Sequence, residues 1–137
     1  MKARIVIVDD HRLLRTGLKS VLEKGDIEVV GEADDGRVAA RLIARLQPAA
    51  VLTDISMPRR NGIEFIREIH REFPEIKVLV LSMHKETRFI MESFAAGAAG
   101  YVVKDSGVEE IRRALELVLA GGKLGVANRR YSVEGSV

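Results

Sequence analysis

The sequence predicts an α/β fold in which a doubly wound, five-stranded parallel sheet lies between two layers of helices. Three observations support this fold class. Short runs of β-branched residues alternate five times with segments whose apolar residues recur at helical spacing. The chain has 137 residues, which suits one domain. Hydrophobic residues make up 47% of it and aromatic residues only 4%, a composition typical of buried parallel strands covered by helices.

Five strands are expected where apolar residues form short runs without a helical period. These runs span residues 4–8, 28–33, 49–53, 77–82 and 99–103. The first and third runs stop abruptly at aspartates, which marks the carboxyl ends of the strands. Because a helical segment follows every run, the strands are expected to be parallel and joined by right-handed crossovers.

Five helices are expected from apolar residues at helical spacing and from the glycines and prolines that end the segments. The helical patterns cover residues 14–22, 38–46, 63–69, 86–96 and 108–120. Among doubly wound sheets of five strands, the order 2-1-3-4-5 is common, and it places a topological switch point between strands one and three. Functional groups are therefore expected at the carboxyl ends of the strands beside that point.

The overall composition narrows the class of protein. The formal net charge is +2 with both signs mixed along the chain, so no basic stripe indicates nucleic-acid binding. The absence of cysteine fits a reducing compartment. No signal-peptide pattern and no apolar stretch of membrane-spanning length is present, so we expect a cytoplasmic protein without membrane contact. Residues 1–122 are expected to form the domain, and residues 123–137 a linker or terminal tail.

Chemically versatile residues stand at the ends of the central strands: Asp9, Asp10, Asp54, Ser82 and Lys104. Three carboxylates in one crevice repel one another unless a cation lies among them, and carboxylate oxygens suit Mg²⁺. A lysine and a hydroxyl at the same place would suit a phosphate group. Each residue alone has an ordinary explanation as a helix cap, a turn residue or an exposed side chain. These separate explanations do not account for five such residues that all stand at the carboxyl ends of strands.

Four motifs, IVIVDDH, DISMPRRNG, LVLSMH and GYVVKD, occur in this order in the sequence. Together they resemble the receiver domains of response regulators in bacterial two-component systems, whose sheet has a flavodoxin-like order. The resemblance covers about residues 3–122. The DDH and KD variants are most similar to the NarL/FixJ subgroup, whose members usually carry a LuxR-type helix-turn-helix output domain.

The resemblance implies a role for each residue of the site. Asp54 would be the phosphoacceptor, and Mg²⁺ would be held by Asp9, Asp10, Asp54 and the backbone carbonyl of Ser56. Lys104 would bind the phosphate, Ser82 would be the switch hydroxyl, and Tyr101 the switch aromatic residue that fills the space vacated by Ser82. Pro58 and Gly62 match the turn after the acceptor.

The same resemblance implies partners and a biological role. A histidine kinase would donate the phosphoryl group, DNA would be bound through an output domain that follows residue 137, and activation would favour a homodimer. The domain would catalyse only its own phosphorylation and dephosphorylation, so it is expected to be a signalling switch and not an enzyme. In one departure from the family pattern, Asp105 replaces the proline that often follows the lysine, so a cis peptide bond is not expected there.

Three alternatives are open at this point. A phosphatase of the haloacid-dehalogenase type would need Asp-x-Asp after the first strand, where the sequence reads Asp9-Asp10-His11. A flavin mononucleotide carrier would need a phosphate loop rich in glycine, serine or threonine at the same place. A stand-alone receiver that acts through protein contacts would share all the motifs and lack only the output domain.

Overall fold

The structure is a computed structural model that describes residues 2–57 and 60–121. Pro58 and the tail expected at residues 123–137 lie outside the described residues. The strands are β1 (Ala3–Val8), β2 (Ile27–Ala33), β3 (Ala50–Thr53), β4 (Ser56–Met57), β5 (Arg60–Asn61), β6 (Lys77–Ser82) and β7 (Gly100–Val103). The helices are α1 (Arg12–Leu22), α2 (Gly36–Leu46), α3 (Gly62–Glu72), α4 (Thr87–Ala96) and α5 (Val108–Leu119), with a short 3₁₀ helix, η1 (Lys104–Ser106), after β7.

The main sheet of the described chain has five parallel strands in the order β2-β1-β3-β6-β7. Counted along the chain and without the two-residue strands β4 and β5, this is the predicted order 2-1-3-4-5. The fold class is therefore confirmed. The switch point lies between β1 and β3, where Val8 pairs with Thr53. This pairing places Asp9 and Asp54, the next residues of each strand, at one edge of the sheet.

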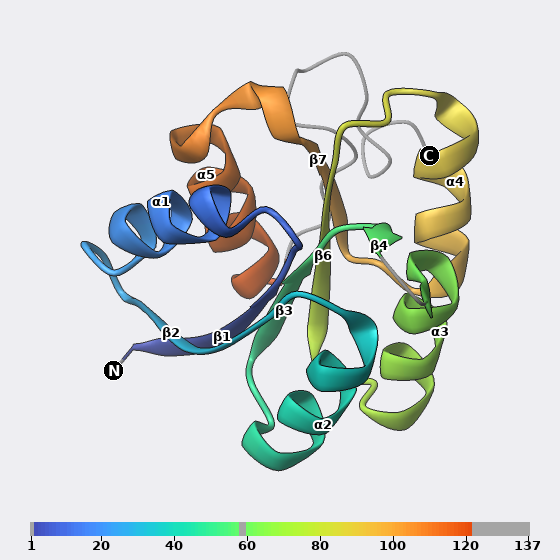
Figure 1. Cartoon of the computed structure of the whole chain (residues 1–137), viewed down its shortest axis with the longest axis horizontal. Helices are drawn as coiled ribbons and strands as arrows, with labels where there is room; N and C mark the ends of the chain where they lie inside the picture. The colour runs from blue at the N-terminus through green and yellow to red at the C-terminus, as the bar shows by residue number, and fades with distance from the viewer. Residues whose placement is uncertain (1, 58–59, 122–137) are drawn as a thin grey trace.

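Helices cover both faces of the sheet, with α1 and α5 on one side and α2, α3 and α4 on the other (Figure 1). Successive side chains of a strand point to opposite faces. Accordingly, Val6 and Val8 of β1 pack into the core beneath α2, α3 and α4, whereas Ile5 and Ile7 pack into the core beneath α1 and α5. A hydrophobic core thus packs against each face of the central strands, and the polar residues follow directly after those strands.

The structure differs from the sequence-based expectation in a few local features. The loop expected at residues 55–61 contains a short antiparallel pair, in which Ser56 of β4 lies opposite Asn61 of β5. Two-residue strands are too short to leave a period in the sequence. A 3₁₀ turn, η1, follows β7, and Glu86 is the N-cap of α4 instead of its first residue. No cis peptide bond occurs in the described ranges, so the Lys104–Asp105 bond is trans, as expected.

Candidate functional site

The backbone of the two central strands sets the positions of Asp9 and Asp54. The amide of Asp54 donates to the carbonyl of Val8 (3.0 Å), and the amide of Asp9 donates to the carbonyl of Ala33 (3.0 Å). These parallel-sheet bonds extend the ladder by one residue beyond each strand. As a result, both aspartates are almost fully buried, with 1% and 3% of their surface exposed. Two buried carboxylates side by side require a positive partner.

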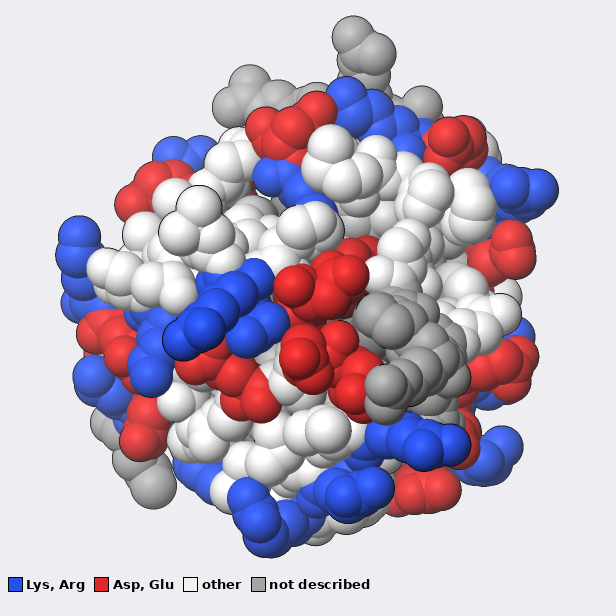
Figure 2. Space-filling view, in the orientation of Figure 1, with Lys and Arg blue, Asp and Glu red and all other residues white. Residues whose placement is uncertain are grey.

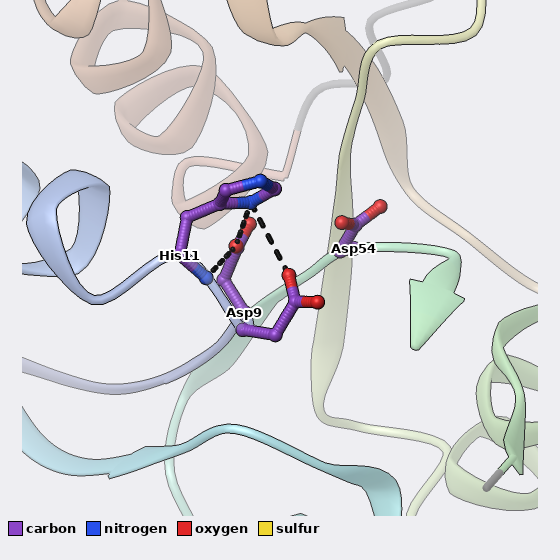
Figure 3. Close-up of side chains that lie close together, drawn as sticks. Asp9, His11 and Asp54 are labelled. Atoms are coloured by element: carbon purple, nitrogen blue, oxygen red, sulfur yellow. Dashed lines mark hydrogen bonds and ion pairs between the residues drawn. The ribbon is translucent and has the colours of Figure 1, made fainter. Parts of the chain in front are cut away.

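Four side chains form a cluster that could hold a metal ion: Asp9, Asp10, His11 and Asp54. One ligand atom from each lies within 4.8 Å of all the others. Figure 3 shows the His11 ring directed at Asp9, with Asp54 on the neighbouring strand. Asp9 Oδ2 is buried and makes no hydrogen bond within the described part of the chain. A buried carboxylate oxygen in this condition, among further carboxylates, fits Mg²⁺, which prefers oxygen ligands.

Lys104 brings a positive charge into this cluster. Its Nζ donates a hydrogen bond to Asp54 Oδ2 (2.8 Å) and lies 2.9 Å from Asp9 Oδ2, at ion-pair distance but outside hydrogen-bonding geometry. Burial alone would lower the pKa of Lys104, but the hydrogen bond to Asp54 and the negative charges of Asp54 and Asp9 outweigh this effect and raise the pKa above its usual value. The ammonium group therefore stays charged and can neutralise a further anion at Asp54.

The segment after Asp54 is held tightly against the Asp54 side chain. Ser56 donates its backbone N–H to Asp54 Oδ1 (3.0 Å), which fixes one carboxylate oxygen in an Asx-type turn. Gly62 packs so closely on this turn that a Cβ there would lie 2.6 Å from the carbonyl carbon of Ile55. Only glycine fits at that distance, which explains the glycine in the DISMPRRNG motif. The Asn61 side chain accepts from the backbone N–H of Ile63 (2.9 Å) and caps α3 directly after the turn.

The residues expected to form the switch meet at the loop between β6 and α4. Ser82 is fully buried, and its Oγ accepts a hydrogen bond from the backbone N–H of His84 (3.0 Å). Tyr101 is also fully buried, and its hydroxyl donates to the carbonyl of His84 (2.7 Å). The sequence led us to expect that Tyr101 enters the space vacated by Ser82. In this structure the ring already lies inside the protein while Ser82 is bonded to the loop.

His84 connects this loop to the segment that follows Asp54. Its Nε2 lies 3.1 Å from Ser56 Oγ, and its ring stacks on Phe89 of α4, with 4.3 Å between the ring centroids. Sequence reasoning assigned no role to His84 or to His11. Both stood in the quoted motifs LVLSMH and IVIVDDH, so the available signal was their position one or two residues after a strand-end residue of the site.

The surface around the site carries mixed charge. Figure 2 shows acidic side chains gathered near the middle of the viewed face, with basic side chains beside them. The viewed face does not present a basic stripe of the kind that binds nucleic acid. In the described ranges, no helix is long and apolar enough to cross a bilayer. The charged groups that the structure brings together at the buried aspartates are carboxylates that could hold a metal ion and the ammonium group of Lys104.

Comparison with known proteins agrees with this geometry. Residues 5–116 match the family described as the response regulator receiver domain. The transcriptional regulatory protein DegU of Brevibacillus brevis is 38% identical over 122 residues, which cover 88% of this chain and 52% of DegU. The crystal structure of a LuxR-family two-component response regulator from Aurantimonas sp. SI85-9A1 superposes with a TM-score of 0.86 at 34% identity, covering 99% of this chain and 94% of that one.

A further match is the RcsB response regulator of Salmonella typhimurium, in a structure concerned with conformational dynamism for DNA interaction. It has a TM-score of 0.83 at 28% identity and covers 90% of this chain and 62% of that chain. The chain spans about half the length of the curated relatives it matches. The part that it shares with them is the domain that carries the aspartate cluster. The chain therefore belongs to the family of response regulator receiver domains, and its relatives are transcriptional response regulators.

Proposed function

We propose that Asp54 accepts a phosphoryl group from the phosphohistidine of a histidine kinase, and that this modification switches the signalling surface of the domain. The observation that carries the proposal is the contact of the buried Asp54 carboxylate with Lys104, 2.8 Å away, beside Asp9. A carboxylate that is buried, ionised and paired with a retained positive charge is suited to nucleophilic attack on phosphorus.

In the proposed reaction, a carboxylate oxygen of Asp54 attacks phosphorus in line with the leaving imidazole nitrogen. The new O–P bond gives an acyl phosphate, the N–P bond breaks, and the imidazole of the kinase leaves. Lys104 then faces the added negative charge, which its ammonium group neutralises. Asp54 Oδ1 is held by the Ser56 backbone amide, so the carboxylate keeps one orientation throughout. A bound Mg²⁺, held by Asp9, Asp10, Asp54 and the Ser56 carbonyl, would neutralise charge on the transferring group.

The same groups suggest how phosphorylation is read. The new phosphate oxygens would compete with the His84 amide for the Ser82 hydroxyl. Loss of the bond between Ser82 and His84 would release the loop before α4, to which Tyr101 is bonded through the His84 carbonyl. The change of charge at Asp54 would thereby shift the equilibrium between two conformations of one segment, which runs from the β6–α4 loop through α4 to β7.

The relatives support a transcriptional output. DegU is named a transcriptional regulatory protein, and the RcsB structure concerns DNA interaction. We therefore propose that the intact protein regulates transcription through a DNA-binding domain linked to this receiver, and that activation favours a homodimer. The domain turns over no metabolite in this role, because its chemistry is confined to its own aspartate.

The test is phosphorylation with a small acyl phosphate donor, such as acetyl phosphate, followed by electrophoresis in a gel that retards phosphoproteins. We expect one retarded band that needs Mg²⁺ and is lost on chelation. Asp54→Asn should abolish it, whereas Asp34→Asn, an exposed aspartate after the edge strand β2, should leave it intact. Retention of the band by Asp54→Asn would exclude Asp54 as the acceptor.

A further inference from the structure

The turn after β1 carries Asp10 out of the sheet. The amide of Asp9 still bonds to the carbonyl of Ala33 in the ladder (3.0 Å), but Asp10 follows beyond it, and 39% of its side chain is exposed. One Asp10 oxygen nevertheless belongs to the acidic cluster, within 4.8 Å of a ligand atom of every other member. An exposed side chain is ordinarily free to take several directions, and holding it in one costs entropy. A further contact is therefore needed to keep Asp10 turned toward the cluster.

Arg15, in the first turn of α1, supplies a contact of this kind. Its Nη1 donates to the backbone carbonyl of Asp9, and its Nε donates to Oε1 of Glu32 in β2 (3.2 Å). The amide of Arg15 also donates to the carbonyl of His11 (3.1 Å). Only 15% of the Arg15 side chain is exposed, so water competes little for these bonds. One side chain thus connects the end of β1, the start of α1 and the edge strand β2.

The bond to the Asp9 carbonyl restricts the direction of Asp10. That carbonyl belongs to the planar peptide unit that joins the two aspartates, so fixing its oxygen fixes the plane and the position of the Asp10 Cα. The guanidinium group is itself rigid and planar, and Glu32 holds its other side. The Asp9 side chain is held separately, by its ion pair with Lys104 (2.9 Å). The loss of the Arg15 bond would therefore act mainly on Asp10.

The charge of Arg15 and its bond to the turn have opposite effects on a bound cation. Arg15 and Arg12 both line the hollow beside Asp10. A positive charge at this place repels a metal ion and would weaken its binding. A bond that keeps the Asp10 carboxylate in place strengthens binding, because the ligand then needs no ordering when the ion arrives. Metal affinity therefore distinguishes a positioning residue from an ordinary charged neighbour.

We propose that Arg15 is a positioning residue of the site, which holds the Asp9 carbonyl against Glu32 and thereby keeps the Asp10 carboxylate in the acidic cluster. This inference rests on the proposed metal site and deepens it. Arg15 touches neither the ion nor the phosphoryl group in this role, and it acts through Asp10. The positioning effect exceeds the repulsion, because Glu32 already neutralises much of the guanidinium charge.

The first experiment measures Mg²⁺ affinity by calorimetry, with folding of each variant checked by circular dichroism. Arg15→Gln removes the charge and cannot make both bonds, so it should weaken Mg²⁺ binding roughly three- to tenfold, as the loss of a group that orients a metal ligand does. Arg15→Lys keeps the charge and one donor group, so its affinity should lie between that of Arg15→Gln and that of the unsubstituted protein. Arg12→Gln is the matched control, because it removes an exposed positive charge from the same helix and should leave Mg²⁺ affinity unchanged or raise it. Unchanged or tighter Mg²⁺ binding by Arg15→Gln would overturn the proposal. If that variant does not fold, an unchanged affinity of Arg15→Lys would overturn it instead.

A double-substitution cycle tests whether Arg15 acts through Asp10. In the Asp10→Ala background, Arg15→Gln should cause no further loss of Mg²⁺ affinity, since the carboxylate that Arg15 positions is absent. An equal loss in both backgrounds would refute the proposal. In the metal-free protein, amide exchange at Asp10 and His11, measured by nuclear magnetic resonance, should be faster in Arg15→Gln, because the His11 amide donates to Asp9 Oδ1 across the same turn (2.8 Å). Unchanged exchange would show that the turn does not depend on Arg15, and the proposal would fail.

The outcomes separate this inference from the proposed function. If Asp10→Ala and Asp54→Asn weaken Mg²⁺ binding but Arg15→Gln does not, the proposed metal site stands and the positioning role of Arg15 fails. If neither aspartate substitution changes Mg²⁺ affinity, the proposed metal site is wrong and this inference falls with it.

Discussion

Lys104 Nζ donates to Asp54 Oδ2 across 2.8 Å, although 50 positions separate the two residues in the sequence. The topology explains this contact. Strand β6 lies between β3 and β7, so Lys104 and Asp54 follow strands that are two places apart, roughly 10 Å in a sheet. The long lysine side chain spans that gap over the end of β6. The positive charge and the carboxylate are thus brought together by the strand order itself.

The first prediction separates the roles of Asp10 and Lys104. Asp10→Ala should weaken Mg²⁺ binding at least several-fold, because it removes a carboxylate from the cluster. Lys104→Ala should leave Mg²⁺ affinity intact or raise it, because it removes a neighbouring positive charge. Both variants should impair phosphorylation. Calorimetric titration with Mg²⁺ checks the first two statements, with Lys85→Ala, an exposed lysine paired with Asp105, as the control. An equal loss of affinity in the two variants would contradict this division of roles.

A second prediction concerns the tight turn after Asp54. Gly62→Ala should lower the free energy of unfolding by about 1–3 kcal/mol, because its Cβ would overlap the backbone of Ile55. It should also slow phosphorylation, since the same turn positions Asp54. Gly17→Ala is the matched control, because a Cβ on Gly17 of α1 would meet nothing within 4 Å. In that variant the free energy of unfolding should rise by up to about 1 kcal/mol, because alanine favours the helix over glycine by that amount. Urea denaturation measures the stability of both variants. An unfolding midpoint of Gly62→Ala equal to that of the unsubstituted protein would contradict the packing argument.

The third prediction is a pH effect at Tyr101. Burial raises the pKa of the Tyr101 hydroxyl above its ordinary value. The folded protein therefore holds this proton more tightly than the unfolded chain. The resulting stability is fully present below the unfolded pKa of about 10 and is lost as the pH rises through the folded pKa.

Tyrosinate absorbance measures this effect, with circular dichroism of the same samples to monitor folding. The protein has two tyrosines, so Tyr131→Phe leaves Tyr101 as the only reporter. We expect it to ionise above the pKa of free tyrosine, or only as the protein unfolds. In Tyr101→Phe the absorbance reports the ionisation of Tyr131 alone, which is the comparison for Tyr101. Ionisation of Tyr101 near pH 10 or below in the folded protein would show that the hydroxyl is not buried as described.

A fourth prediction locates the surface that responds to phosphorylation. Beryllofluoride, which mimics an aspartyl phosphate, should change amide hydrogen exchange most at residues 83–104. The reason is that Ser82 and Tyr101 are both hydrogen-bonded to the backbone of His84, in the loop that leads to α4. Ser82→Ala should reduce the change, because it removes the hydroxyl that the mimic would recruit. A change confined to α1, with residues 83–104 unaffected, would place the responsive surface elsewhere.

The strand order and the strand-end residues of the site could be predicted from sequence for a physical reason. Parallel strands bring their carboxyl ends to one edge, so Asp9, Asp54 and Lys104 had to converge once the strand order was inferred. Their burial followed from the apolar runs before them. A hydrophobic core on each face of the sheet was also expected, because those runs are apolar at successive positions, which point to opposite faces.

The loop contacts could not be predicted in the same way. The hydrogen bond of His84 to Ser56 and its stacking on Phe89 join three segments whose relative positions depend on the complete fold. The Tyr101 ring is buried in the core cluster that also contains Ile90 and Ala96 of α4, and no period in the sequence encodes how that helix packs. Likewise His11 looked like an ordinary residue before a helix, because its direction toward the carboxylates is set by the backbone turn after β1.

The most direct test of the central claim is to map the modified residue after treatment with an acyl phosphate and Mg²⁺. Borohydride reduction converts an aspartyl phosphate to homoserine, which mass spectrometry of peptides can place at a single position. We predict homoserine at residue 54 alone, and none in Asp54→Asn or when Mg²⁺ is chelated. Homoserine at residue 9 or 10 in the protein without substitutions would contradict the assignment of Asp54 as the phosphoacceptor. An unchanged Asp54 in a fully phosphorylated sample would contradict it as well.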